Sequence, residues 1–241
     1  MGVQAAPQPA HNCPCIFADC PISTMPLLLH VATTNPGKLR DFEVAAKPHA
    51  RDVVFVRLHG MERIKPPPED GATFEENSRS KAIEYSRHAP GAIVLADDSG
   101  LEVDALHGAP GVRSARYAAD AGFDPESLGT TTDDVRNNVF LLEKMQDVLP
   151  ARRTARYRCV LAAARDGECI AVAHGTVEGI LLETPRGSGG FGYDPLFYVP
   201  ELHQTMAEIS LEEKYTISHR GHALRRLLTQ LIPSQNQATN L

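Results

Sequence analysis

The chain has 241 residues, of which 42% are hydrophobic and 22% are charged, and its formal net charge is −6. This length suffices for one α/β domain with its own core, and the negative charge gives no general attraction to nucleic acid, whose phosphates favour clustered Lys and Arg. The composition is typical of a globular protein, and no apolar run reaches the roughly 20 residues of a membrane-spanning helix. We therefore expect neither a nucleic-acid partner nor a membrane association.

The N-terminal segment differs in composition from the rest of the chain. Residues 1–25 are rich in Ala, Pro and Cys without hydrophobic periodicity, which predicts a disordered tail before a folded domain at residues 26–235. Met25 directly precedes the first strand pattern and is an alternative start of the chain. The three cysteines between residues 13 and 20 lack the fourth ligand of a usual zinc site. An odd total of five cysteines without a clear secretory signal predicts reduced thiols and a cytoplasmic location.

Hydrophobic periodicity predicts alternating strands and helices along the domain. In chain order, the patterns indicate a strand at 27–33, a helix at 38–47, a strand at 52–58, a helix from 73 to about 88, a strand at 92–101 and a helix from about 133 to 148. The runs 155–165 and 168–182 flank Asp166-Gly167, which is typical of a β-hairpin and makes the sheet mixed. Ser210 and Glu213 form a capping-box pattern before a helical C-terminal stretch. The fold class is therefore α/β.

A polar turn connects the first predicted strand to the first predicted helix. It consists of Thr33, Thr34, Asn35, Pro36, Gly37 and Lys38. Hydroxyls, an amide, backbone N–H groups and one ammonium at a helix N-terminus are what a polyphosphate requires. The turn is not a P-loop, because it has a single glycine and Leu39 follows the lysine. The alternative is an ordinary capped turn without a ligand.

Two adjacent carboxylates, Asp97 and Asp98, follow the apolar run of a predicted buried strand. Uncompensated charge there is costly, and Mg²⁺ removes that cost because it binds one or two carboxylates together with phosphate oxygens. Glu69, in the loop before the next helix, is a candidate second ligand, and Lys81 lies about two helical turns after Thr73. The alternatives are a structural turn for the Asp pair and a solvated surface position for Lys81.

Two clusters in the C-terminal third are suited to a nucleobase. Phe191 stands in a glycine-rich loop with Gly192, Tyr193 and Asp194, and a base can stack on its ring. The alternative is that Phe191 and Tyr193 fill the core beneath the loop, which aromatic side chains do more often. The second cluster, Lys214, Ser218, His219 and Arg220, offers donors to the carbonyl edge of a purine. Arg carries donors only and therefore favours an oxo group over an amino group.

Five motifs together resemble the family of inosine/xanthosine triphosphate pyrophosphatases: ATTNPGK, FEENSRSKA, ADDSGLEVDALHGAPGVRSARYA, GGFGYDP and EEKYTISHRG, in that order from about Leu27 to Ile232. The resemblance implies an elongated central mixed sheet flanked by helices, two lobes with an active-site cleft between them, and a homodimer. It further implies a hydrolase that cleaves non-standard purine nucleoside triphosphates (ITP, dITP, XTP, dXTP) to the monophosphate and pyrophosphate, with Mg²⁺ as cofactor.

Carried over motif by motif, the resemblance assigns a role to each cluster. Residues 33–38 hold the triphosphate, Glu69 and Asp98 bind Mg²⁺, Asp98 is the proposed general base and Lys81 neutralises phosphate charge. Substrate contacts fall on Ser99, Phe191, Gly192, Tyr193, Asp194, Lys214, His219 and Arg220, with Arg113 and Arg116 as weaker candidates. Two rival functions stay open: a related pyrophosphatase for pyrimidine or modified nucleotides, and a nucleotide sensor that does not hydrolyse.

Overall fold

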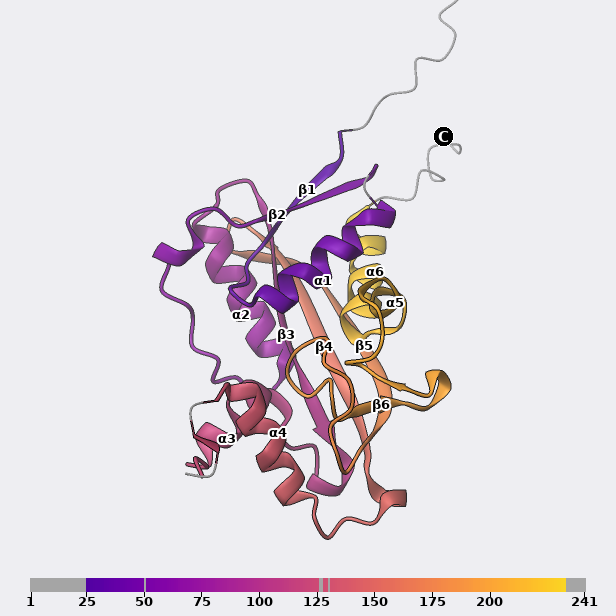
Figure 1. Ribbon diagram of the computed structural model, residues 1–241. Coiled ribbons are helices and arrows are strands. Elements are labelled where there is room, and N and C mark those ends of the chain that lie inside the picture. Colours follow the sequence, from indigo (N-terminus) through magenta and orange to yellow (C-terminus); the bar gives the residue numbers. More distant parts are fainter. Residues whose placement is uncertain (1–24, 50, 126–127, 130, 233–241) are drawn as a thin grey trace, which may run out of the picture.

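The structure, a computed structural model, describes residues 25–49, 51–125, 128–129 and 131–232 (Figure 1). The predicted disordered tail and its three cysteines lie outside these residues, apart from Met25. Within the described part of the chain, no helix is long and apolar enough to cross a bilayer. The cytoplasmic location stays a prediction from the sequence.

A seven-stranded sheet forms the centre of the molecule, in the order β2-β1-β3-β4-β5-β6-β7. The strands are β1 (Leu27–Val31), β2 (Val53–Arg57), β3 (Ile93–Val103), β4 (Thr154–Arg165), β5 (Glu168–Leu181), β6 (Phe197–Val199) and β7 (Gln204–Thr205). β1 is parallel to β2 and β3, whereas the other neighbours are antiparallel. The predicted mixed sheet is therefore confirmed, and its long strands β3, β4 and β5 run the length of an elongated molecule (Figure 1).

Helices cover both faces of the upper half of this sheet. These are α1 (Pro36–Ala46), α2 (Phe74–Arg87), α5 (Leu211–Ile217) and α6 (His219–Leu231), whereas α3 (Tyr117–Asp120) and α4 (Asp133–Lys144) lie at the lower half (Figure 1). α2 packs on β3 and β4 in a core with Val94 and Ala96, whereas α1 and α6 share the opposite core with Leu95 and Leu161. Because successive side chains of a strand point to opposite faces, odd positions of β3 face α1 and α6, and even positions face α2.

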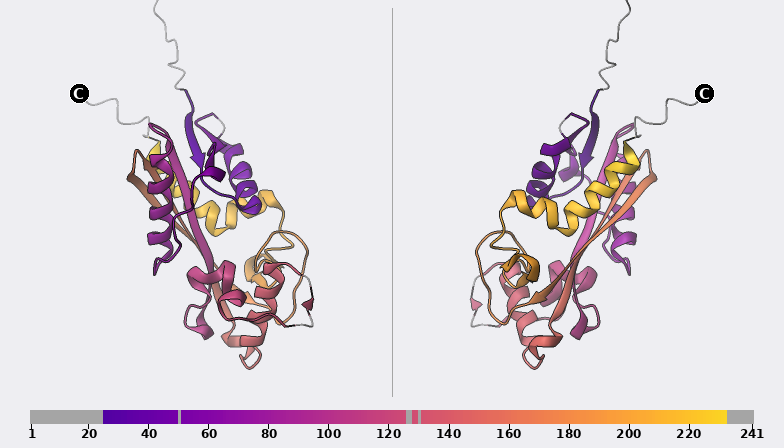
Figure 2. Two further views of the ribbon diagram at one scale, coloured as in Figure 1. Left: turned by 90° about the vertical axis from the view of Figure 1, so that its left-hand side faces the viewer. Right: turned by 90° about the vertical axis from the view of Figure 1, so that its right-hand side faces the viewer.

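Another hydrophobic core lies at the lower half of the sheet. It joins Leu101 of β3, Leu141 of α4 and Phe197 of β6. In the side views, this lower part and the α1–α6 part lie along one sheet at different heights (Figure 2). The predicted two-lobe arrangement is therefore present, and β3 to β5 form the common wall of both lobes.

A glycine of β5 allows the N-terminus of α6 to approach the sheet closely. A Cβ atom at Gly175 of β5 would lie 1.9 Å from the carbonyl oxygen of His219 and 2.5 Å from the amide nitrogen of Ala223, so only glycine fits there. This contact places the first turn of α6, and with it His219 and Arg220, directly against the sheet.

Several predicted boundaries are wrong in detail. β3 spans Ile93–Val103 instead of 92–101, because β4 pairs with it from Val94 to Val103 and supplies backbone partners for the polar stretch. The predicted helical C-terminal stretch consists of two helices, since Ser218 ends α5 and caps α6 by accepting from the amide of Gly221. The Asp166-Gly167 hairpin is confirmed, with both residues at positive φ as this two-residue turn requires.

Candidate active site

One cavity of about 420 Å³ opens between the two lobes, within the usual size of small-molecule sites. It gathers residues from the β1–α1 turn, the loop before α2, β3, α4, the glycine-rich loop and the start of α6. The predicted site residues that line it are Thr33, Thr34, Asn35, Lys38, Glu69, Lys81, Asp98, Ser99, Phe191, Gly192, Tyr193, Asp194, Lys214, His219 and Arg220. Pro36 and Gly37 are the two predicted residues of this set that do not line it.

The β1–α1 turn is a capped helix start that also presents a cation. The Asn35 side chain accepts from the amides of Gly37 (2.8 Å) and Lys38 (3.2 Å), and Pro36 occupies the first helical position. The ring of Phe191 lies over Gly37, where a Cβ atom would be 2.4 Å from it. The turn therefore supports the phosphate interpretation through Lys38, while Pro36 and Gly37 shape the turn and leave room for the ring.

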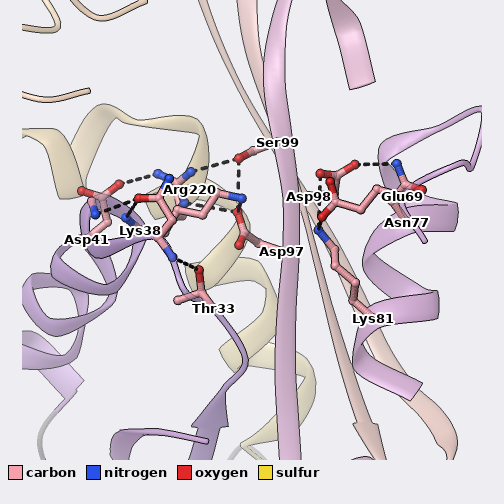
Figure 3. A network of polar contacts seen from close by, with 12 residues as sticks. Thr33, Lys38, Asp41, Glu69, Asn77, Lys81, Asp97, Asp98, Ser99 and Arg220 are labelled. Carbon is pink, nitrogen blue, oxygen red and sulfur yellow. Dashed lines mark hydrogen bonds and ion pairs between the residues drawn. The ribbon is translucent and has the colours of Figure 1, made fainter. Parts of the chain in front are cut away.

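On the α1 and α6 side of β3, Asp97 is the centre of a cluster of charges (Figure 3). Its Oδ2 lies 2.8 Å from Lys38 Nζ and 3.6 Å from Arg220 Nε. Arg220 also donates to Asp41 and, at 3.0 Å, to the Ser99 hydroxyl. Burial alone raises the pKa of Asp97, but the nearby Lys38 and Arg220 cations more than offset this and hold the pKa below its usual range. This carboxylate is therefore ionised and fixes two cations at the cavity.

On the opposite side of β3, Asp98 faces α2 (Figure 3). Lys81 Nζ lies 2.8 Å from Glu69 Oε1 and 3.5 Å from Asp98 Oδ1, and the amide of Asn77 donates to Asp98 Oδ2 at 2.9 Å. Burial raises the pKa of Asp98, and the Lys81 ammonium only partly offsets it. Lys81 is buried, so the alternative of a solvated surface lysine is wrong. Without a bound metal ion, the pKa of Asp98 therefore lies above that of an ordinary aspartate.

Glu69 and Asp98 form a two-carboxylate set with a cation between them. Among the residues that the structure describes, no group of three or more His, Cys, Asp or Glu side chains is placed to hold a metal ion. Two carboxylates nevertheless suffice for Mg²⁺, which completes its shell with water and phosphate oxygens. The donor set therefore fits Mg²⁺ with a phosphorylated ligand better than a metal enclosed by protein ligands alone.

The glycine-rich loop and the start of α6 form the third part of the cavity. Lys214 Nζ lies 2.8 Å from Asp194 Oδ2, and the Phe191 amide donates to the same oxygen at 3.0 Å. The His219 ring stacks on Tyr157 with a centroid distance of 4.8 Å, and no described residue forms a hydrogen bond with its Nδ1. Burial, reinforced by the Arg220 charge, holds the pKa of His219 well below its usual range. This side of the cavity therefore presents a neutral imidazole among charged groups.

The two aromatic residues of the loop differ in their surroundings. Tyr193 is buried in the lower core and donates from its hydroxyl to the Ser114 carbonyl at 2.8 Å, which fits the core-filling alternative. Phe191 is half-buried, lines the cavity and lies 5.7 Å from the Arg220 guanidinium carbon. Phe191 is thus the aromatic ring of this loop that is available to a ligand.

Sequence reasoning missed three contributors to the site. Asp41 and Tyr157 line the cavity, and Asn77 donates to Asp98 beside it. Asp97, which the sequence pairs with Asp98, instead holds the cations Lys38 and Arg220. Asp41 stands one helical turn after Lys38, and Asn77 one turn before Lys81, so helical spacing was an available signal for both. Tyr157 lies in an apolar strand pattern and gave no signal.

The two weaker candidates lie at the edge of the site. The Arg116 guanidinium donates to the Glu69 carbonyl at 2.8 Å and lies 3.8 Å from its carboxylate. Arg113 pairs with Asp120 and does not line the cavity. Arg116 therefore supports the Glu69 loop, whereas Arg113 has no contact with the described site.

A comparison with protein families identifies the chain. A model of the Ham1 family matches residues 29–230. The chain belongs to the Ham1 family. Every side chain of the cavity falls within this match, so the site described above is the Ham1 region of the chain.

Similar proteins agree with this membership in sequence and in structure. The chain is 56% identical over 207 residues to the dITP/XTP pyrophosphatase of Acidobacterium capsulatum, covering 86% of this chain and 99% of the relative. It is 48% identical to the enzyme of the same name from Thermus thermophilus, covering 82% and 88%. A solved HAM1 structure from Coxiella burnetii, 36% identical, superposes with a TM-score of 0.70 over 85% of this chain and 98% of that one.

Proposed function

We propose that this Ham1 protein hydrolyses the non-standard purine triphosphates ITP, dITP, XTP and dXTP to the nucleoside monophosphate and pyrophosphate. One observation carries the proposal: a single cavity combines fixed cations, a buried aspartate with a raised pKa and a pocket with an aromatic ring and several donors. The cations suit a triphosphate, the aspartate suits its hydrolysis, and the aromatic ring with the donors suits a purine. The similarity to proteins named dITP/XTP pyrophosphatase supports the same reaction.

The reaction is attack of water on a phosphorus surrounded by negative oxygens, so positioning and charge neutralisation govern its rate. Lys38 and Lys81 lie on opposite sides of β3 and both line the cavity, so they reach different parts of a bound triphosphate chain. Both ammoniums are held by buried carboxylates, Asp97 and Asp98, so neither has to be ordered when the substrate arrives.

Glu69 and Asp98 are the residues that would hold Mg²⁺ here. Bound there, the ion supplies charge neutralisation at the phosphoryl oxygens and activation of a water. The chain itself contributes the orientation of Asp98, which Asn77 fixes through one carboxylate oxygen, and the basicity that burial gives to its carboxylate. Asp98 accepts the proton of the attacking water, and Lys81 balances the charges around it.

Phe191, His219 and Arg220 form the side of the cavity that binds the base. The purine stacks on Phe191 while donors meet the 6-oxo group, which ATP replaces with a 6-amino donor. A buried donor left without an acceptor costs enough to reject the wrong base by up to about 10⁴ to 10⁵-fold. The arrangement therefore favours 6-oxo over 6-amino purines.

A substrate panel tests the proposal against its two rivals. With Mg²⁺, we expect pyrophosphate release from ITP, dITP and XTP, and far slower release from ATP, GTP and dUTP. Preference for dUTP would instead establish the pyrimidine-directed rival. Tight ITP binding without release of any pyrophosphate would establish the sensor, although the presence of Lys38, Glu69, Lys81 and Asp98 in one cavity favours hydrolysis. The homodimer implied by the family resemblance stays a prediction.

A further inference from the structure

The carboxylate of Asp194 is bonded at both oxygens within the protein. Its Oδ2 accepts from Lys214 Nζ at 2.8 Å and from the Phe191 amide at 3.0 Å. Its Oδ1 accepts from the Tyr157 hydroxyl at 3.3 Å. Asp194 is buried and lines the cavity beside Phe191, so these bonds use acceptor capacity in the pocket assigned above to the base.

Tyr157 is held so that its hydroxyl keeps this direction. Its ring stacks on that of His219 with a centroid distance of 4.8 Å and an interplanar angle of 15°. It also packs on the ring of Phe197 of β6, with a centroid distance of 4.5 Å. The side chain is buried, and burial together with the Asp194 charge raises the pKa of its hydroxyl well above the usual value. The hydroxyl therefore stays protonated and donates to Asp194.

The three 6-oxo purines differ at position 2 of the ring. Hypoxanthine carries hydrogen there, xanthine carries an oxo acceptor, and guanine carries an amino donor. An ionised carboxylate only accepts hydrogen bonds, so a free oxygen of Asp194 would favour the 2-amino group of guanine and repel the 2-oxo group of xanthine. An oxygen that already accepts from a hydroxyl attracts the 2-amino group less and repels the 2-oxo group less.

We propose that Tyr157 determines specificity against guanine nucleotides by occupying Asp194 Oδ1. A 2-amino group that enters the pocket must then compete with the Tyr157 hydroxyl for Asp194 Oδ1 and is bound less well, whereas the hydrogen at position 2 of hypoxanthine needs no acceptor. This proposal rests on the proposed function, and it explains how a site built for 6-oxo purines excludes GTP. Tyr157 acts through Asp194 and is a positioning residue, not a catalytic one.

The direct test is Tyr157→Phe, which keeps the ring on His219 and removes the hydroxyl. We expect kcat/KM for GTP relative to ITP to rise about tenfold, the lower limit for a regained hydrogen bond to a charged group. We expect kcat/KM for XTP relative to ITP to fall, because the exposed carboxylate oxygen repels the 2-oxo group. A loosened pocket would raise or lower both ratios together, so the opposite signs distinguish the two causes.

Two further variants make the test specific. Tyr198→Phe removes a hydroxyl that bonds His203 outside the cavity, and it should leave both ratios unchanged. Asp194→Asn combined with Tyr157→Phe should abolish the gain for GTP that the single variant shows, because the gain requires the carboxylate. A Tyr157→Phe enzyme with unchanged ratios, or a gain for GTP that persists without the carboxylate, would overturn the inference. A wild-type protein that fails to hydrolyse ITP would overturn the proposed function instead.

Discussion

Replacement of Asp98 by Asn should lower kcat for ITP by at least about 100-fold, the usual contribution of a positioned general base. The amide keeps an oxygen that accepts from Asn77, so the side chain stays in place, but it neither accepts a proton nor balances the charge of Lys81. Steady-state kinetics with Mg²⁺ at saturating ITP measure the loss. Because the amide is also a weaker metal ligand, the Mg²⁺ concentration required for half-maximal rate should increase.

A matched variant on the same strand separates this effect from damage to the sheet. Glu102 also belongs to β3, but its carboxylate pairs with Arg158 at 3.5 Å and does not line the active-site cavity. Glu102→Gln should therefore keep near-normal kcat, and both variants should unfold near the wild-type temperature. Near-normal turnover by Asp98→Asn would remove this residue from the mechanism.

Arg220→Ala should reduce the discrimination between ITP and ATP by roughly 10 to 150-fold, since a lost hydrogen bond to a charged group costs about 1.5 to 3 kcal/mol. The guanidinium lies near Phe191, and its Nε, 3.6 Å from Asp97 Oδ2, has no hydrogen-bond partner among the residues that the structure describes. Measuring kcat/KM for both nucleotides with the same preparation tests this, because losses shared by both substrates cancel in the ratio. Such losses are expected, as the variant leaves Asp41 and Asp97 with one cation fewer.

Lys38→Ala is the matched comparison for Arg220. Both cations contact Asp97, but Lys38 stands at the start of α1 and is assigned to phosphate. Its removal should slow ITP and ATP by similar factors and leave the discrimination unchanged. If Arg220→Ala also slows both nucleotides equally, Arg220 has a phosphate or structural role and its assignment to the base is wrong.

Much of the site was accessible to sequence reasoning because its polar groups stand beside recognisable local patterns. Lys38 follows a turn at a helix start, Lys81 lies on a capped helix, and Phe191 stands in a glycine-rich loop. Each pattern is local, so each cluster was found separately. That they line one cavity follows from the antiparallel pairing of β3, β4 and β5, which brings the C-terminal clusters beside the N-terminal ones.

The different surroundings of Asp97 and Asp98 were not predicted. The predicted strand at 92–101 contains both residues, but their place after the apolar run gives them one shared role as a pair of carboxylates. In the structure, β4 pairs with the strand as far as Val103, so both residues lie in regular β-structure. Alternation along β3 then sends Asp97 towards Lys38 and Arg220 and Asp98 towards Lys81 (Figure 3).

Contacts between segments that are distant in the sequence could not be predicted, for a different reason. Tyr157 of β4 bonds Asp194, 37 residues away in the sequence, and stacks on His219 of α6. Nothing in the strand pattern around Tyr157 distinguishes this ring from an ordinary core residue, because periodicity reports which face a side chain occupies and not what it meets there.

The central claim is that the cavity splits a 6-oxo purine triphosphate between its α- and β-phosphates, and the products of a complete ITP digest test it most directly. Purified protein with Mg²⁺ should convert ITP to equal amounts of IMP and pyrophosphate, as quantified by ion-exchange chromatography with a phosphate assay, and the Asp98→Asn protein should form neither at a comparable rate. Formation of IDP and orthophosphate, or of no product under conditions where ITP binds, would contradict the account.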